Sequence, residues 1–469
     1  MNSYSKITES RKITRSAGVV SFFTLMSRIL GLLRDMVLAR YFGSNRIADA
    51  FFVAFRIPNF LRRLFAEGSL TIALIPVFTE YLKKNSRQEA LQMARVIFTL
   101  LSIILVFISI VGILLSPWIV RIQAFGFGGS GFKYELTVLL TRITFPYIFF
   151  ISLAALFMGI LNSFRHFAAP SAAPIFLNLG IITSTIWLSP HFSQPIVAVA
   201  IGVIVGGIFQ VALQLPWIYH YGISLRPSWM PHHPAVKRIG KLMLPAIFGS
   251  AIYQFNQFIN TLLASFLPDG SISWLYYADR LVQFPLGVFG IAIGTAILPS
   301  LSSQIAENDL ELFKETLGHF LRLVLFISIP SLTGLIILGK PILMLFFEGG
   351  AFSSHSTDMT YSALFFYSIG LWAFSGLRIL VNAFYSFQDT ITPVKIAIII
   401  LGLNLFLGIL LMGPMKHSGL ALALSISSGC QFCLLLFLLK KRLNWSISCL
   451  LYTSPSPRDL STSRMPSSA

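Results

Sequence analysis

The chain has 469 residues, of which 55% are hydrophobic and only 11% charged, and its formal net charge is +18. Soluble globular proteins carry about 25% charged residues, so this composition excludes an ordinary soluble domain and predicts an integral membrane protein. The net charge raises nucleic acid as a partner, but the loop cations are dispersed rather than clustered. We therefore expect no nucleic acid among the partners.

Apolar stretches long enough to cross about 30 Å of hydrocarbon as helices recur along the chain, separated by short polar or proline-containing connections. This pattern predicts an all-α polytopic membrane protein of about twelve transmembrane helices in two six-helix halves. The first six are expected at 17–40, 48–81, 93–120, 136–161, 171–189 and 195–219. The second six are expected at 240–266, 273–302, 318–346, 357–385, 394–413 and 418–439.

The basic residues of the loops predict the orientation, because Lys and Arg near helix ends are retained in the cytoplasm. A cytoplasmic N-terminus places most of them on that side, including Lys83, Lys84, Arg87 and the run 440–442. The first apolar stretch lacks a small-residue cleavage site, so we expect it to be a retained helix rather than a signal peptide.

The second half of the chain resembles the first. The segment ILNSFRHF around Asn162 matches LVNAFYSF around Asn382, about 220 positions later, and IALIPVF around Pro76 matches TAILPSL around Pro299. An even number of helices per half makes the repeats parallel, which is a transporter layout. We expect a cytoplasmic segment at 1–16, an N-lobe at 17–220, a linker at 221–239, a C-lobe at 240–442 and a polar tail at 443–469, disordered or non-native to this fold.

Charged residues lie inside several predicted helices. The first helix carries Arg28, Arg34 and Asp35, each costing about 2.5 to 3.5 kcal/mol at the bilayer centre, so we expect them to avoid lipid. In the second helix, a charged stripe runs along one face, with neighbours beside it. Its residues are Asp49, Arg56, Arg63 and Glu67, with Asn59 and Arg62 beside them. The eighth helix adds Asp279 and Arg280 next to Pro285.

Two interpretations of these charges stay open. Buried ion pairs or snorkelling side chains explain charges near helix ends, and we favour that interpretation for Arg40, Arg46, Arg121 and Arg322. In the central set, basic residues outnumber the nearby carboxylates, which favours an anionic substrate. The guanidinium group binds phosphate through two parallel hydrogen bonds, so a pyrophosphate group fits this cluster.

Other polar residues are less informative. Cys430 and Cys433 form a C-x-x-C spacing inside an apolar helix, where we expect small buried thiols rather than a metal site. His232 and His233 are expected in a solvated loop. The polar residues of the seventh helix either line a cavity or hold helices together, and both remain open; they are Gln254, Asn256, Gln257 and Asn260.

Several of these segments resemble the MurJ (MviN) family of lipid II flippases, within the multidrug/oligosaccharidyl-lipid/polysaccharide exporter superfamily. They are SRILGLLRD at 27–35, DAFFVAFRIPNFLRRLFAEGS at 49–69, ITFPYI at 143–148, SWLYYADRLVQFPLGVFG at 273–290 and TPVKIA at 392–397. The resemblance covers about residues 15–445. It implies a transporter, not an enzyme, that moves lipid II from the cytoplasmic to the periplasmic leaflet of the bacterial inner membrane for peptidoglycan synthesis.

The resemblance also implies site residues and partners. The family's substrate-binding positions fall on Arg28, Arg34, Asp49, Arg62 and Arg280, to which the cation excess adds Arg63. It implies no cofactor, drive by the membrane potential or a coupling ion, and contacts with membrane lipids and the cell-wall synthesis machinery. Alternatives are a flippase for another polyprenyl-linked glycan or a drug/cation antiporter, although an antiporter predicts an excess of carboxylates.

The chain departs from the family pattern in two places. Gln283 stands where many relatives have an acidic residue after the eighth-helix Asp-Arg pair. The family usually has fourteen helices, whereas a Ser/Pro-rich polar segment follows Trp445 here, so the last two helices are expected to be missing.

Overall fold

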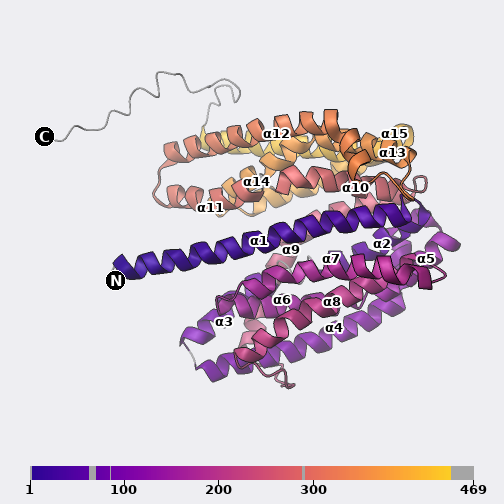
Figure 1. Cartoon of the computed structure of the whole chain (residues 1–469). Coiled ribbons are helices and arrows are strands. Elements are labelled where there is room, and N and C mark those ends of the chain that lie inside the picture. The colour runs from indigo at the N-terminus through magenta and orange to yellow at the C-terminus, as the bar shows by residue number, and fades with distance from the viewer. Residues whose placement is uncertain (1–2, 63–69, 85, 288–290, 445–469) are drawn as a thin grey trace. The chain divides into compact units, whose positions relative to one another are not determined.

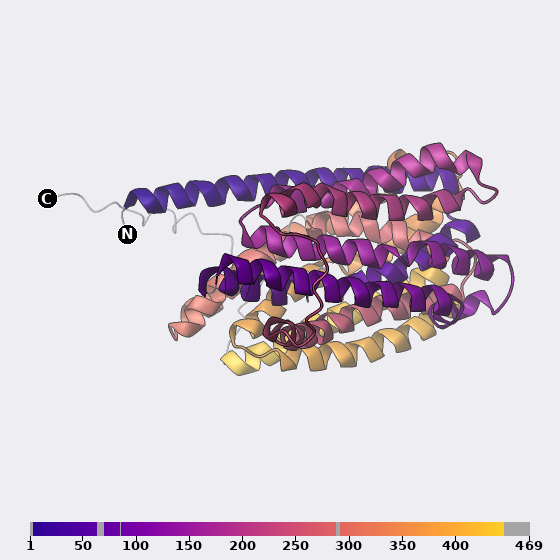
Figure 2. The same ribbon diagram turned by 90° about the horizontal axis from the view of Figure 1, so that it is seen from below.

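The computed structural model describes residues 3–62, 70–84, 86–287 and 291–444. Within these ranges the regular structure is helical, which confirms the all-α class, and the single β-bridge joins Gly349 and Phe352. The following helices make up the first part of the chain: α1 (Ser3–Phe42), α2 (Arg46–Leu61), α3 (Thr71–Lys84), α4 (Arg87–Gln123), η2 (Phe125–Phe127), α5 (Phe132–Thr144), α6 (Tyr147–Ser163), α7 (Ala168–Leu188), η3 (Ser189–His191) and α8 (Ile196–His220). The remaining ones are α9 (Pro234–Ser265), α10 (Ser271–Pro285), α11 (Ile291–Ala306), α12 (Leu310–Phe346), α13 (Ser354–Ile369), α14 (Leu371–Ser386) and α15 (Ile391–Leu443) (Figures 1 and 2).

The chain forms two compact units. Unit 1 contains residues 1–277 together with 340–362 and 412–420, and unit 2 contains 278–339, 363–411 and 421–469. Each unit has its own apolar core. The core of unit 1 includes Leu74, Phe78 and Phe157, and the core of unit 2 includes Phe313, Leu380 and Phe384.

Glycines set the closest helix packing in unit 1, between α7 and α8 (Figure 1). A Cβ atom on Gly206 would lie 2.7 Å from the Cα of Leu177, and one on Gly180 would lie 2.7 Å from the Cα of Gly206. Small residues let helix backbones approach this closely, and inside a membrane such packing replaces the hydrophobic drive that water would supply. α7 also contacts α1.

Two of the predicted single spans are interrupted within the described residues. The span at 136–161 contains α5 and α6, and the one at 357–385 contains α13 and α14, which are bent by 42°. The span expected at 48–81 includes α2 and α3, and the one expected at 273–302 includes α10 and α11; the connections at 63–69 and 288–290 lie outside the described residues. Pro58 lies inside α2 and Pro285 ends α10, and a proline removes one helical hydrogen bond.

Conversely, α15 contains two of the predicted spans. Lys416 inside it has φ 51° and ψ −134°, which no helix can accommodate, just after Pro414. Arg442 near its C-terminus donates a 3.0 Å hydrogen bond to Asp389, the residue two positions before its first helical residue. The two arms of α15 therefore run back along each other, as the expected spans 394–413 and 418–439 require.

Six helices among the described residues are long and apolar enough to cross a membrane, or seven if the bent pair α13 and α14 counts as one. They establish a multi-pass membrane protein. They do not by themselves establish the predicted count of about twelve.

Helix boundaries recur along the chain at a constant interval. α4 and α12 are each 37 residues long, and they end at Gln123 and at Phe346, 223 positions later. The turns after α6 and α14 repeat at the same interval. Phe164 directly follows α6, Phe387 directly follows α14, and each of them precedes a residue with positive φ. The structural interval is thus 223, the separation of Pro76 and Pro299, rather than the 220 that pairs Asn162 with Asn382.

Candidate functional site

Arg34 and Asp35 form a buried ion pair in α1. Their exposed fractions are 8% and 2%, and the guanidinium group donates to Asp35 Oδ1 through Nε at 3.0 Å and through Nη2 at 2.7 Å. Arg34 Nη1 donates to Asn178 Oδ1 at 3.1 Å, and Tyr276 OH donates to Asp35 Oδ1 at 3.1 Å. The charge of Arg34 is therefore compensated by a carboxylate of its own helix.

Sequence reasoning missed the two residues that orient this pair. Asn178 lies in α7, and its side-chain amide also donates to the Ser27 carbonyl at 3.0 Å. It therefore links α7 to α1 by a second hydrogen bond. Tyr276 lies in α10 and stacks on Phe52 with ring centroids 4.0 Å apart. A lone Asn in the apolar run IFLNLGII was the available signal, because a polar side chain in a membrane helix needs an internal partner.

Asp49 holds the beginning of α10. Its carboxylate is 1% exposed and accepts hydrogen bonds from Gly270 N (2.8 Å), Ser273 N (2.9 Å) and Ser273 Oγ (2.7 Å). The ammonium group of Lys133 lies 3.0 Å away as a fourth partner. A carboxylate has about four acceptor positions, so all of them are occupied by the protein. Its negative charge at the N-terminus of α10 also favours that helix.

The arginines of α2 and its C-terminus differ in their partners. Arg56 donates through Nη1 to the Gln257 carbonyl at 3.3 Å and to the hydroxyl of Thr261, both in α9. Arg62 directly follows α2 and donates to the side chain of Asn59 in α2 at 3.1 Å. Tyr147 of α6 donates through its hydroxyl to Gln210 of α8 at 3.3 Å.

The remaining predicted residues fall into three groups. Arg28 is exposed on α1, seven residues from Asp35 and thus on the same face. Arg280 is exposed and Asp279 partly buried on α10 in unit 2, where Gln283 donates to Asp279 at 3.3 Å. Gln283, which stands where many relatives have an acidic residue, thus contacts Asp279. Two further residues lie outside the described residues, namely Arg63 and Glu67.

The structure tests two lesser expectations. Cys433 is exposed and Cys430 half-buried, so the expectation of buried thiols is wrong for Cys433. His232 is exposed as expected, and His233 caps α9 by accepting a 3.2 Å hydrogen bond from Ala235 N. In the seventh predicted helix, the backbone carbonyl of Gln257 accepts from Arg56, while both interpretations of the polar side chains stay open.

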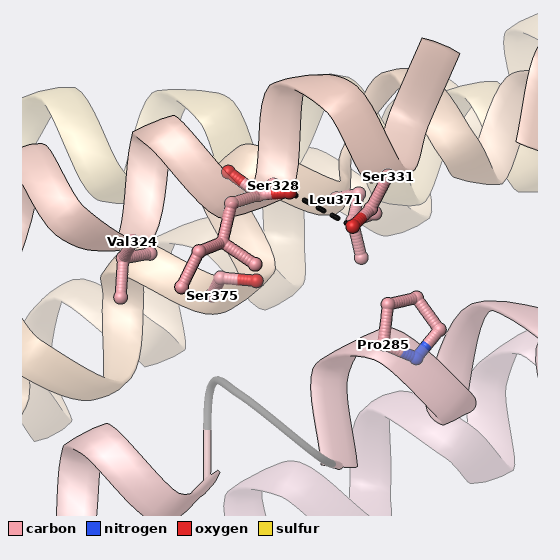
Figure 3. Close-up of a pocket in the computed structure, with 7 residues that line it drawn as sticks. Pro285, Val324, Ser328, Ser331, Leu371 and Ser375 are labelled. Carbon is pink, nitrogen blue, oxygen red and sulfur yellow. Dashed lines mark hydrogen bonds between the residues drawn. The ribbon is translucent and has the colours of Figure 1, made fainter. Parts of the chain in front are cut away.

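A cavity of about 10 Å³ lies beside Pro285 in unit 2 (Figure 3). Three serines line it, Ser328, Ser331 and Ser375, and Ser331 donates to the Ile327 carbonyl at 2.8 Å. This volume suits one water molecule. It cannot hold a substrate.

In unit 1 these residues connect six helices by polar contacts: α1, α2, α5, α7, α9 and α10. The arrangement holds the Arg34 guanidinium group in a defined orientation, because Arg34, Asp35 and Asp49 each have several protein partners. Guanidinium groups are suited to the recognition of an anion such as phosphate.

Comparisons with known proteins agree with this arrangement. The family model described as "Lipid II flippase MurJ" matches residues 38–454. The probable lipid II flippase MurJ of Vibrio cholerae is 40% identical over 92% of this chain and 83% of its own length, and the lipid II flippase MurJ of Burkholderia cenocepacia is 39% identical over 91% and 84%.

Solved structures give the same result. The structure described as lipid II flippase MurJ in an inward closed conformation has a TM-score of 0.78, is 31% identical, and is matched over 90% of this chain and 87% of that one. An inward-facing multidrug resistance MATE transporter of the MOP superfamily has a TM-score of 0.77 at 14% identity, over 91% and 98%, and shares the fold. By both sequence and structure, the chain belongs to the lipid II flippase MurJ family.

Proposed function

We propose that this chain is a lipid II flippase, which moves the polyprenyl-pyrophosphate-linked peptidoglycan precursor from the cytoplasmic to the periplasmic leaflet by alternating access. Membership of the MurJ family over most of the chain carries this proposal. The arginine-rich segments of α1 and α2 and the Asp-Arg pair of α10 supply its chemistry, since guanidinium groups at membrane depth suit a pyrophosphate.

The arginines divide into two roles. Arg28 and Arg280 are exposed and are assigned direct contacts with the substrate's phosphates. Arg34 is a positioning residue, because Asp35, Tyr276 and Asn178 fix its orientation and balance its charge. Arg62, whose guanidinium group donates to Asn59, extends the positive region along α2.

The proposal includes a topology of twelve spans with the N-terminus in the cytoplasm and two parallel lobes at 17–220 and 240–442. The fold-back of α15 supports the count, because this one element supplies two spans. The recurrence of helix ends at an interval of 223 residues supports the parallel repeat.

Alternating access requires an inward-facing and an outward-facing state. The substrate can favour the change from one state to the other only if it binds one of them more tightly. Bringing several guanidinium groups together in a closed state costs electrostatic energy, and the pyrophosphate lowers that cost by neutralising them. In this mechanism the bound substrate is the anion whose charge allows the protein to change from the inward-facing to the outward-facing state.

The test uses cells depleted of their own flippase and measures lipid II exposed on the outer leaflet. Loss of one charge-assisted contact costs about 1.5 to 3 kcal/mol, so Arg28→Ala and Arg280→Ala are each expected to lower export about tenfold or more. Arg28→Lys is expected to restore part of it, because lysine keeps the charge and loses the planar fork.

The matched control is Arg87→Ala, which removes an exposed arginine whose contact is the Tyr221 carbonyl at 3.2 Å. It is expected to export like the parent. Export by Arg28→Ala and Arg280→Ala at the parent's rate, with equal amounts of protein in the membrane, would refute the assignment.

A further inference from the structure

The bend of α15 contains a buried histidine that has no part in the site described above. His417 is 3% exposed and lies between the spans expected at 394–413 and 418–439. Its imidazole contacts Met359 and Ser362 of α13 and the ring of Trp274 in α10. All of these residues belong to unit 1. His417 thus joins three helices that are distant from one another in the sequence.

The contacts of His417 define its protonation state. Nε2 lies 2.8 Å from the Met359 carbonyl oxygen, so this nitrogen carries a proton and donates it. The same nitrogen lies 3.1 Å from Ser362 Oγ, which is 2.8 Å from Ser418 Oγ. Nδ1 is buried and has no hydrogen-bond partner. The fold therefore holds a neutral imidazole whose second nitrogen is unprotonated.

Trp274 connects His417 to the end of α1. The indole and imidazole rings lie 4.7 Å apart between their centroids, and Trp274 Nε1 donates to Ser44 Oγ at 2.7 Å. Ser44 follows α1, and its hydroxyl donates to Ser356 Oγ of α13 at 2.7 Å. The bend of α15 is therefore part of a closed set of contacts with α10, α13 and the residues after α1.

The backbone next to His417 is strained. Lys416 has φ 51° and ψ −134°, a combination that residues with a Cβ atom rarely adopt. Such a conformation persists only where surrounding contacts hold it in place. Lys416 itself is exposed, whereas His417 and Ser418 are buried against α13. The contacts of these two residues thus hold the bend.

A second proton on His417 would disturb these contacts. It would bind to Nδ1, which has no partner, and would place a positive charge on a group removed from water. The Trp274 ring would return part of the cost through a cation–π contact. A buried charge without a carboxylate partner stays unfavourable nonetheless.

The surrounding elements offer no such carboxylate within the described residues. Asp358 of α13 pairs with Lys340 at 2.6 Å, and Glu348 accepts a 2.7 Å hydrogen bond from Thr357. The other titratable groups on these elements are Lys416, His355, Tyr361, Tyr276 and Tyr277. Among the charges, that of Lys416 acts on His417, and it has the wrong sign to stabilise an imidazolium.

Burial lowers the pKa of His417 from its ordinary 6.5; the hydrogen bond to the Met359 carbonyl opposes this shift, and the charge of Lys416 adds to it. Because the folded state lowers the pKa, the stabilisation by the neutral imidazole is fully present above about pH 6.5. It is lost as the pH falls below that value toward the lowered pKa.

We infer that His417 is a proton-sensitive latch. Its neutral imidazole holds the bend of α15 to α13 and α10, and its protonation releases the bend, which the strained backbone of Lys416 favours. The inference concerns the protein without substrate, so it does not depend on the transport proposed above.

The test is hydrogen exchange, measured by mass spectrometry on peptides covering 412–420 of the purified full chain in neutral detergent. Protection is compared at about pH 7.5 and about pH 5.5, after correction for the intrinsic effect of pH on exchange. In the parent, protection of these peptides is expected to fall up to about tenfold. A histidine whose pKa is lowered by folding costs about a factor of ten in stability for each pH unit below its ordinary value.

His417→Gln is expected to give equal protection at both pH values, because its amide keeps a donor for Met359 and does not titrate. His355→Gln is the matched control. It removes an exposed histidine of α13 whose ring lies 6.1 Å from that of Trp274, and it is expected to keep the parent's response.

Equal protection of the parent at both pH values would overturn the inference. So would a response that persists in His417→Gln, or one that disappears in His355→Gln. If His417→Gln does not fold, the parent and His355→Gln decide the question by themselves.

Discussion

Burial divides the charged side chains of the predicted site into two groups. Asp49 and Asp35 are almost fully buried with several protein donors each, so both are held in place by the fold. Arg28 and Arg280 are exposed, and these are the residues that we propose contact the substrate. Charged residues that look alike in the sequence thus have different surroundings in the fold.

The contacts of Asp49 predict that Asp49→Ala reduces stability strongly. The change leaves the donors of Gly270 and Ser273 unsatisfied and removes one partner of Lys133, which together cost about 3 kcal/mol or more. A fluorescence melting curve in detergent measures the effect. Asp269→Ala is the control, because its side chain is 59% exposed and the pair is worth about 1 kcal/mol or less. Equal melting temperatures of both variants would show that Asp49 does not anchor α10.

Asp389 predicts a pH dependence at the other end of the chain, in the turn between α14 and α15. Hydrogen bonds from Thr392, at 3.0 Å to its N–H and 2.8 Å to its hydroxyl, and from Arg442 hold the pKa of this carboxyl below its usual 3.8. Because the folded state lowers the pKa, the stabilisation is fully present above about pH 4 and is lost as the pH falls through the lowered value.

Hydrogen exchange of the first turn of α15 is the corresponding measurement. At pH 7, Asp389→Ala is expected to lower protection about fivefold, since losing an N-terminal cap costs about 1 kcal/mol. The difference from the parent is expected to shrink as the pH falls below 4. A difference that stays constant down to pH 3 would contradict the role of the ionised carboxylate.

Among the helices, location follows from composition, but division and pairing do not. Long apolar runs predict where helices lie, but they do not show the 42° bend between α13 and α14. The partners of Arg34 are beyond such reasoning, because Asn178 and Tyr276 are 144 and 242 residues away in the chain and only tertiary packing selects them.

The contact of α7 with α8 predicts that Gly206→Ala destabilises the protein. The added methyl group would lie 2.7 Å from the Leu177 backbone, and overpacking of this kind typically costs about 1 to 3 kcal/mol. Gly402→Ala in α15 is the matched control, since nothing lies within 4 Å of its added methyl group and alanine favours a helix by up to about 1 kcal/mol. Thermal stability in detergent distinguishes them, and a Gly206→Ala protein as stable as Gly402→Ala would disprove the close approach.

At the level of the whole molecule, a duplicated helix order is combined with an uneven distribution of charge. Corresponding helices end 223 residues apart, so the two halves share a plan, yet the buried Arg34–Asp35 pair belongs to α1 alone. Members of the MOP superfamily with only 14% identity share the fold. Family membership, by contrast, connects this chain with lipid II.

Binding of purified lipid II to the full chain tests the central claim most directly, since the claim is that exposed arginines at membrane depth bind its pyrophosphate. Native mass spectrometry of the parent, Arg28→Ala and Arg87→Ala compares retained lipid II at equal melting temperatures. Arg28→Ala is predicted to bind about tenfold more weakly than the parent, and Arg87→Ala to bind equally well. Undiminished binding by Arg28→Ala would contradict the account.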